Sequence, residues 1–179
     1  LRLDDIDAAC LDRLVSDAVQ EDRQLDYKEK LPSEADKQEF LADVASFANT
    51  TGGDLIYGIR EARDTEGKLT GEPAEVIGLP NINLHDERLR LENLIRDGIR
   101  PRVAVMFHEV ERRTRPPCLV IRVPRSWVGP HLVVFKGHDR FYGRNSGGKF
   151  RLDYEQIRDA FSAGESGRER VRAFRADRV

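Results

Sequence analysis

The residues best suited to chemistry lie in the stretch Glu21–Lys30, which reads EDRQLDYKEK. Acidic and basic side chains alternate there as they would along a strand, with Leu25 and Tyr27 on one face and Asp26 and Lys28 on the other. Carboxylate oxygens bind hard cations such as Mg²⁺, and a bound cation can activate water or stabilise charge on a phosphodiester. The competing interpretation is a turn cap and a local ion pair, because charged residues on strand edges are common.

Basic residues are concentrated in the second half of the chain. Residues 1–99 carry 12 Lys or Arg and 23 Asp or Glu, whereas residues 100–179 carry 18 and 9. Such an asymmetry indicates a polyanion as partner, although the two halves could also neutralise each other across the fold or a dimer interface. Aromatic residues that could stack on unpaired bases, or fill the core, lie among these cations at Phe135, Phe141, Tyr142 and Phe150. The candidate nucleic-acid contacts are Lys28, Arg122, Arg125, Lys136, Arg140, Arg144, Lys149 and Arg151.

A phosphate-binding loop is a further possibility raised by the segment Gly143–Lys149, which matches G-x-x-x-x-G-K. The next residue is Phe150 rather than Ser or Thr, so the hydroxyl that would bind Mg²⁺ is missing. No helix is expected to start after the lysine, because Asp153 is the first plausible helix cap. Binding of a nucleotide such as ATP is therefore the weakest of the functional hypotheses.

Length and composition indicate a water-soluble protein with one full-sized core. The chain has 179 residues, of which 39% are hydrophobic and 35% charged. No apolar run approaches the roughly 18 residues needed to span a bilayer, and the first ten residues lack the pattern of a signal peptide. Cys10 and Cys118 do not make a disulfide framework, so we expect buried thiols in a reducing, cytoplasmic setting.

Periodicity predicts helices and strands in alternation through the first half. A helix is expected at Asp5–Val19, capped by Asp4 or Asp5, followed by a strand at Glu21–Lys30. Ser33–Asp36 resembles a capping box that opens the next helix, and Asn49–Gly53 ends it. The buried stripe of that helix is predicted to contain Phe40, Leu41, Val44, Ala45, Phe47 and Ala48. The elements expected next are a strand at Asp54–Arg60, a polar, hairpin-like loop at Glu61–Gly71, a short strand at Val76–Leu79 and a helix at Asn83–Ile99.

From Arg102 the pattern changes to alternation, which predicts strands at Val103–Val110, Cys118–Val123, His131–Phe135 and Arg140–Gly143. A helix capped by Asp153 is expected at Asp153–Ala163, and a polar helix at Glu165–Arg178. The fold class predicted is α+β, with a mixed, mainly antiparallel sheet flanked by helices. The expected organisation is an N-terminal helix in residues 1–20, a domain in residues 21–163, and a polar C-terminal helix in residues 164–179 that leads to a further region.

A family resemblance becomes visible when the motifs are taken in order. They read LDYKEKLP, FLADVASFANTTGGDLIYGI, GLPNIN, LENLIRDGIRPRV, LVIRVPRS, FYGRNSGG and LDYEQIRDAF. This series resembles the Schlafen AlbA-like (AlbA_2) domain family, whose members are described as DNA-binding, and covers about residues 20–163. The resemblance implies an α+β fold, in agreement with the periodicity.

The resemblance also implies a site of three carboxylates that binds Mg²⁺ or Mn²⁺, as in the Schlafen nucleases. Two of these carboxylates fall on Glu21 and Asp26, and the third falls on Glu61. The sequence departs from the family pattern in two places. Asp26 stands where Glu is usual, which shortens the reach by one methylene, and Arg60 stands where the nucleases have an acidic residue.

The function expected from these observations is nucleic-acid binding, to RNA or DNA, with metal-dependent endoribonuclease activity on structured RNA as the finer hypothesis. Schlafen nucleases place two such lobes side by side, so the resemblance implies a homodimer for a chain with one lobe. The alternative from another class is a non-catalytic nucleic-acid-sensing or regulatory domain of a transcription regulator or an antiphage defence protein. No membrane partner is expected.

Overall fold

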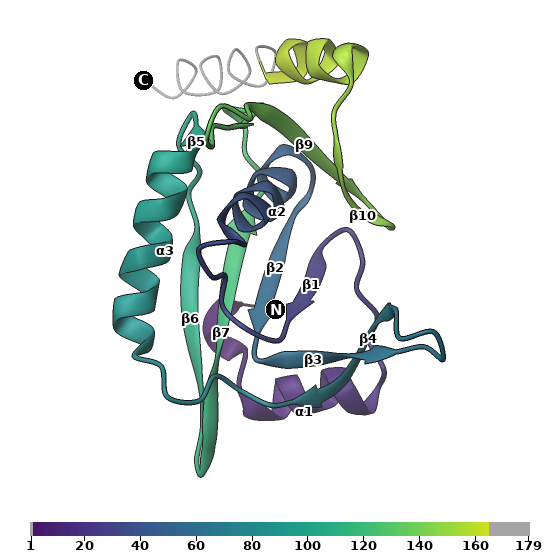
Figure 1. Ribbon diagram of the computed structural model, residues 1–179, viewed down its shortest axis with the longest axis vertical. Coiled ribbons are helices and arrows are strands. Elements are labelled where there is room, and N and C mark those ends of the chain that lie inside the picture. The colour runs from purple at the N-terminus through teal and green to yellow at the C-terminus, as the bar shows by residue number, and fades with distance from the viewer. Residues whose placement is uncertain (1, 165–179) are drawn as a thin grey trace, which may run out of the picture.

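The computed structural model describes residues 2–164 and arranges them as three sheets around one central helix (Figure 1). The main sheet has the strand order β1-β2-β7-β6, with β1 at Leu25–Lys28, β2 at Gly52–Tyr57, β7 at Arg115–Pro124 and β6 at Met106–Arg112. A second sheet has the order β10-β9-β8-β5, with β10 at Gly148–Arg151, β9 at Arg140–Asn145, β8 at Leu132–Val133 and β5 at Ile99–Arg100. The third is the hairpin of β3 (Ile59–Arg63) and β4 (Leu69–Val76).

The helices cover the sheets on several sides. They are α1 (Ala8–Ser16), α2 (Lys37–Asn49) and α3 (Leu84–Gly98), with a 3₁₀ turn at Leu3–Asp5 and a further helical stretch at residues 154–164. The pair β1 and β2 is parallel, and the other strand pairs in the sheets are antiparallel. A parallel pair needs a crossover, which α2 supplies between β1 and β2. The predicted α+β class with a mixed, mainly antiparallel sheet is confirmed.

Helix α2 is sandwiched between the main sheet and the second sheet. The residues from Phe40 to Ala48 are all buried, because β2 and β7 cover one side of the helix while β8, β9 and α3 cover the others. A helix that is buried all round belongs to the interior of a domain. The predicted apolar stripe is therefore confirmed, but burial extends beyond it to Asp43 and Ser46.

The main sheet has two buried faces. Leu55 and Tyr57 face the core around α2, whereas Tyr27 and Ile56 face a second core beneath α1. A strand that is buried on both faces reads as a continuous apolar run, as Leu55–Tyr57 (LIY) does here. Alternation along β1 places Asp26 and Tyr27 on opposite faces, as the sequence predicted, and the fold turns the face of Asp26 toward α2.

The segment Glu61–Gly71, predicted as a hairpin-like loop, does form a hairpin, but most of it belongs to the paired strands β3 and β4 rather than to a loop. Gly58, with a φ of +98°, turns the chain out of β2 and lets β3 pair with β4. The predicted strand at Val76–Leu79 is wrong, because β4 ends at Val76. Strands β5 and β10 were not predicted; both are short, and their residues become strands only through pairing with β8 and β9.

The helix ends differ from prediction in detail. Asp7, not Asp4 or Asp5, caps α1 by accepting a hydrogen bond from Cys10 N–H at 2.8 Å. The capping box before α2 is half formed: the Asp36 carboxylate accepts from Ser33 N–H as expected, but the Ser33 hydroxyl donates to that carboxylate, and Asp36 N–H donates to the Ser33 carbonyl instead.

The predicted cap at Asp153 is correct, since Asp153 accepts from Gln156 N–H at the start of the helical stretch 154–164. Asn83, predicted as the first residue of the helix Asn83–Ile99, is instead the cap of α3. The polar helix predicted at Glu165–Arg178 lies outside the described residues. Among residues 2–164, no helix is both long and apolar enough to cross a lipid bilayer.

Burial of α2 predicts how the fold responds to substitution. Leu41→Ala removes a fully buried side chain from the core between α2 and α3, and we expect a loss of about 2 to 5 kcal/mol in the free energy of unfolding. Leu89→Ala is the matched control, because Leu89 on α3 is largely exposed and should change stability by less than about 0.5 kcal/mol. Urea unfolding followed by circular dichroism measures both. Equal losses in the two variants would contradict the packing described.

Candidate functional site

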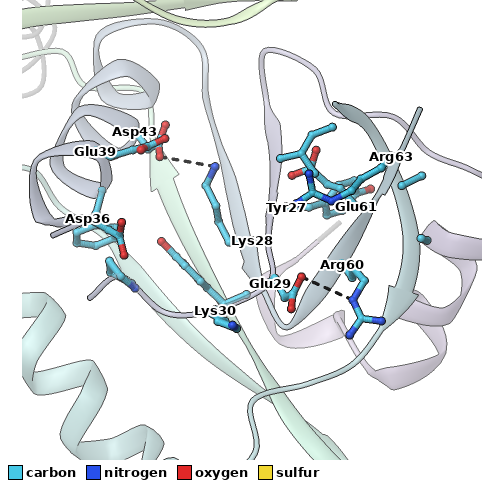
Figure 2. Close-up of a pocket in the computed structure, with 16 residues that line it drawn as sticks. Tyr27, Lys28, Glu29, Lys30, Asp36, Glu39, Asp43, Arg60, Glu61 and Arg63 are labelled. Atoms are coloured by element: carbon cyan, nitrogen blue, oxygen red, sulfur yellow. Dashed lines mark ion pairs between the residues drawn. The ribbon is translucent and has the colours of Figure 1, made fainter. Parts of the chain in front are cut away.

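A groove runs between α2 and β1 on one side and the β3–β4 hairpin on the other. It consists of two adjoining cavities of about 680 and 460 Å³, which share Lys28, Asp43, Glu61 and Leu69 in their lining. Figure 2 shows Lys28 in the middle, reaching toward Asp43 on α2, with Glu61 on the hairpin side. The smaller cavity continues to the turn between β9 and β10. Four separate parts of the fold therefore contribute to one groove.

Asp26 occupies the floor of the smaller cavity and is held between two cations. Its side chain is almost fully buried, with Oδ1 2.7 Å from Lys28 Nζ and Oδ2 2.6 Å from Arg144 Nη2. Arg144 is itself buried, and its guanidinium lies 4.3 Å from the ring centroid of Phe47 on α2. Strand β9 thus delivers the cation that neutralises a carboxylate on β1.

Asp43 is the second buried carboxylate of the groove, and the sequence analysis missed it. Only 1% of the residue is exposed, and its Oδ1 accepts a hydrogen bond from Lys149 Nζ at 2.8 Å. Arg144 Nη1 lies 3.6 Å away from the same oxygen and Lys28 Nζ 3.9 Å from Oδ2. We call Asp26, Lys28, Asp43, Arg144 and Lys149 the charged cluster. The position of Asp43 in the sequence could have indicated its burial, because Asp43 falls three residues after Phe40 and four before Phe47, within the predicted buried stripe.

The electrostatics of the charged cluster keep Asp26 and Lys28 ionised. Burial by itself raises the pKa of Asp26, but Lys28 and Arg144 outweigh it and hold that pKa below its ordinary value. Burial likewise opposes the charge on Lys28, yet Asp43 and Asp26 raise the pKa of its ammonium. The pKa of Asp43 is raised, first by burial and then by the neighbouring charge of Asp26.

Glu21 and Glu61 line the same cavity as Asp26, and no cation from residues 2–164 forms an ion pair with either of them. Glu21 Oε1 accepts a hydrogen bond from Tyr27 N–H, and the Glu21 N–H donates to Gly71 O at 2.7 Å. Burial, followed by the charges of Asp26 and Glu61, raises the pKa of Glu21 to about 7. Burial also raises the pKa of Glu61, with Lys28 acting in the opposite direction. The three carboxylates implied by the resemblance are therefore brought to one cavity.

These residues do not form a ready metal site. Among the described residues, no group of three or more His, Cys, Asp or Glu side chains is placed so that it could hold a metal ion. Both oxygens of Asp26 face cations, and Oε1 of Glu21 faces a backbone N–H. As arranged, the donor set does not fit Mg²⁺ or Mn²⁺, both of which need several free oxygen ligands.

The other predicted cations are spread over different parts of the surface. Arg122 makes a bidentate pair with Asp54 on β2, both contacts at 2.8 Å. Arg125 lies over the ring of Trp127, and Lys136 lies over Phe135. Arg140 donates to the Asp139 carbonyl, and Arg151 is exposed on β10. In the described part of the chain, the predicted cations that line the groove are Lys28, Arg144 and Lys149.

Other groove cations escaped the sequence analysis. Lys30, Arg60 and Arg63 line the larger cavity, beside α2 and along β3. Lys30 belongs to the alternating stretch already singled out, whereas Arg60 and Arg63 lie on β3, part of which was predicted as a hairpin-like loop rather than as a strand.

The segment Gly143–Lys149 does not have the geometry of a phosphate-binding loop. Strand β10 follows directly, where such a loop requires a helix N-terminus. The Lys149 ammonium forms ion pairs with Glu39 at 3.0 Å and with Asp43 at 2.8 Å. The structure therefore gives no support to nucleotide binding there.

The raised pKa of Glu21 predicts a pH-dependent stability. Folding favours the protonated carboxyl, so this contribution is complete below pH 4.5, the ordinary pKa, and is lost as pH rises to about 7. Glu21→Gln stays neutral, so its stability relative to the unmodified chain should increase from pH 5 to 7 and then level off. Urea midpoints measured in EDTA test this, with Glu66→Gln in the exposed hairpin turn as control. A pH-independent difference would contradict the shift.

Two solved structures are similar to this chain at low identity. One is the solution NMR structure of the N-terminal domain of a protein related to the ATP-dependent DNA helicase RecG, from Nitrosomonas europaea. It is 20% identical, with 63% of this chain and 71% of that chain covered and a TM-score of 0.48. The other is the crystal structure of the DIP2311 protein from Corynebacterium diphtheriae, also 20% identical with a TM-score of 0.48; the match covers 81% of this chain but 26% of that chain.

No curated protein is significantly similar to the chain. The family model described as Schlafen, AlbA_2, matches residues 21–153, a range that includes β1, α2, the hairpin, β9 and β10. Every residue of the charged cluster lies inside this match. Since the match spans most of the sequence, the chain belongs to the Schlafen AlbA_2 family.

Proposed function

We propose that the chain is a nucleic-acid-binding domain that holds a strand of RNA or DNA along the groove. Membership of the AlbA_2 family supports a nucleic-acid-related role. The observation that carries the proposal is the row of accessible cations beside the charged cluster: Lys30, Arg60 and Arg63. Cations on a groove wall can contact successive phosphates of a strand that passes along it.

Charge compensation makes this binding physically reasonable. Lys28, Arg144 and Lys149 neutralise Asp26 and Asp43, so the acids that an incoming phosphate would meet without an ion-paired cation from residues 2–164 are Glu21 and Glu61. We call Lys30, Arg60 and Arg63 the rim cations, and the ion pairs that they make are weak. Arg60 pairs with Glu75 at 3.0 Å and with Glu29 at 3.6 Å, and all three side chains are well exposed. Exposed pairs contribute only about 0 to 1 kcal/mol, so exchange for a phosphate costs little.

Binding through the rim predicts a defined salt dependence. The double variant Lys30→Ala/Arg63→Ala should bind a labelled single-stranded oligonucleotide several-fold more weakly. Its slope of log K against log salt should be shallower by about 0.7 for each phosphate that the variant no longer neutralises, because fewer counterions are released. Fluorescence anisotropy with RNA and DNA at several salt concentrations measures both quantities. Arg96→Ala, on the exposed face of α3, is the control. Unchanged affinity and slope in the double variant would contradict the proposed groove.

Metal-dependent endoribonuclease activity is a second candidate, favoured by one electrostatic observation. Glu21, Asp26 and Glu61 share a cavity, and the charges of Asp26 and Glu61 contribute to the raised pKa of Glu21. Like charges held together in this way are common at catalytic sites. Since the residues as arranged do not form a metal cage, we assign no catalytic step to Mg²⁺ or Mn²⁺. The implied homodimer rests on the resemblance alone and stays a prediction.

Cleavage and binding separate the two candidates. If the chain is a nuclease, structured RNA should be cut in Mg²⁺ or Mn²⁺, with activity abolished by EDTA and reduced at least about tenfold in Glu21→Gln and in Glu61→Gln. Glu66→Gln should cut as the unmodified chain does. Denaturing gel electrophoresis of end-labelled RNA measures the rate. RNA binding without cleavage would remove the nuclease candidate and favour a non-catalytic sensing or regulatory domain.

A further inference from the structure

The loop between β7 and β8 presents a large aromatic side chain to solvent. Trp127 is the only tryptophan in the sequence, and 59% of its surface is exposed. The Arg125 guanidinium lies over the indole, 4.7 Å from the ring centroid. Single exposed apolar residues are common on protein surfaces, so exposure alone decides nothing. The cation placed on one face of the ring is the additional feature that requires an explanation.

Hydrogen bonds anchor the loop that carries Arg125 and Trp127 to its neighbouring elements. Ser126 N–H donates to Ala48 O at the end of α2, at 2.9 Å. The side chain of Asn49 accepts from His131 N–H at 2.6 Å and donates to the carbonyl oxygens of His131 and Tyr142. These bonds tie both ends of the loop to α2 and β9. A preformed, rigid contact loses little conformational entropy when a ligand binds.

A small cavity opens beside the indole. Its volume is about 100 Å³, and Arg125 and Trp127 line it together with Asn49 and Pro130. The opposite wall comes from the helical stretch 154–164, through Ala160, Ala163 and Gly164. Small residues leave this wall flat. Gly164 packs so close to the loop that a Cβ there would collide with the carbonyl of Gly129. The cavity is therefore lined by the indole and by small residues of the helical stretch.

We propose that Arg125 and Trp127 form a stacking site for an unpaired nucleobase of a single-stranded nucleic acid. The inference rests on the proposed nucleic-acid-binding function and adds a contact outside the groove. A planar base can stack on an indole face, and a guanidinium beside it can pair with the adjoining phosphate. Paired bases do not expose their faces, so the site selects single strands over duplexes.

Charge favours a polyanion over a protein partner as the occupant. Arg125 makes no ion pair with a described residue, and the described residues that line the cavity include no carboxylate. A cation beside an exposed aromatic face attracts the phosphate next to a stacked base. The chemistry recognised is therefore a base with its phosphate.

Because Trp127 is the only tryptophan in the sequence, its own fluorescence reports on the site. Titration of the full chain with single-stranded oligothymidylate should quench this emission, and the quenching should saturate at the same concentration as the anisotropy of a labelled copy of the oligonucleotide. The matching duplex should quench less. Strong binding by anisotropy without any change in the emission, or equal quenching by duplex and single strand, would overturn the stacking site.

Substitutions supply the second readout. Trp127→Ala should weaken single-strand binding about fivefold to a hundredfold, as expected for removal of one stacked base, whereas Trp127→Phe should retain most of the affinity. Tyr154→Ala is the control, since Tyr154 is 78% exposed on the neighbouring helix but does not line the cavity. Circular dichroism verifies folding, which an exposed side chain should not affect. Unchanged binding in Trp127→Ala, or an equal effect in Tyr154→Ala, would overturn the inference.

The two proposals fail in distinguishable ways. If no oligonucleotide changes the anisotropy, the nucleic-acid-binding function itself is wrong and the stacking site falls with it. If binding is present, depends on Lys30 and Arg63, and is indifferent to Trp127, the groove proposal stands and the stacking site alone is rejected. Weaker binding in both sets of variants supports two contacts for one strand.

Discussion

The buried charged cluster is the interaction on which the rest of this structure depends. It joins β1, α2, β9 and β10 through two carboxylates and three cations, at the point where the main sheet, the central helix and the second sheet meet. Removing one partner of a buried ion pair leaves an uncompensated charge, typically at a cost of about 3 to 5 kcal/mol. The elements that form the groove are therefore held in mutual register by electrostatics as well as by packing.

Packing explains why these charges meet. Apolar residues cover α2 on nearly all sides, so the cations of residues 2–164 that reach Asp43 come from the strands next to it. Arg144 contributes twice, since its guanidinium pairs with Asp26 and also lies over the ring of Phe47. The same contact thus closes the hydrophobic core and forms the floor of the groove.

The balance of charge within the groove shapes its chemistry. Both oxygens of Asp26 face cations, whereas burial disfavours the charge of Glu21 and Glu61, with the charge of Asp26 adding to the effect at Glu21 and Lys28 opposing it at Glu61. The groove therefore has mixed charge, since Lys30, Arg60 and Arg63 line its larger cavity together with Glu29, Asp36 and Glu39. The charge asymmetry of the sequence indicated a basic second half. Ion pairs between the two halves neutralise part of this excess positive charge, as the pairs of Arg122 and Arg144 demonstrate.

The sequence by itself determined the fold class, the family, the helices α2 and α3, and the alternation that places Asp26 and Lys28 on one face of β1, because these depend on local periodicity and on ordered motifs. It indicated a hairpin-like loop but not the pairing of β3 with β4, and it could not predict strands β5 and β10, which face of β1 meets α2, or the role of Asp43. Only the tertiary structure decided these. Edge strands form by pairing with distant segments, and Asp43 becomes part of an ion-paired cluster only because the fold places cations from other strands beside it. Arg144 lies 118 residues after Asp26, and no local pattern encodes that contact.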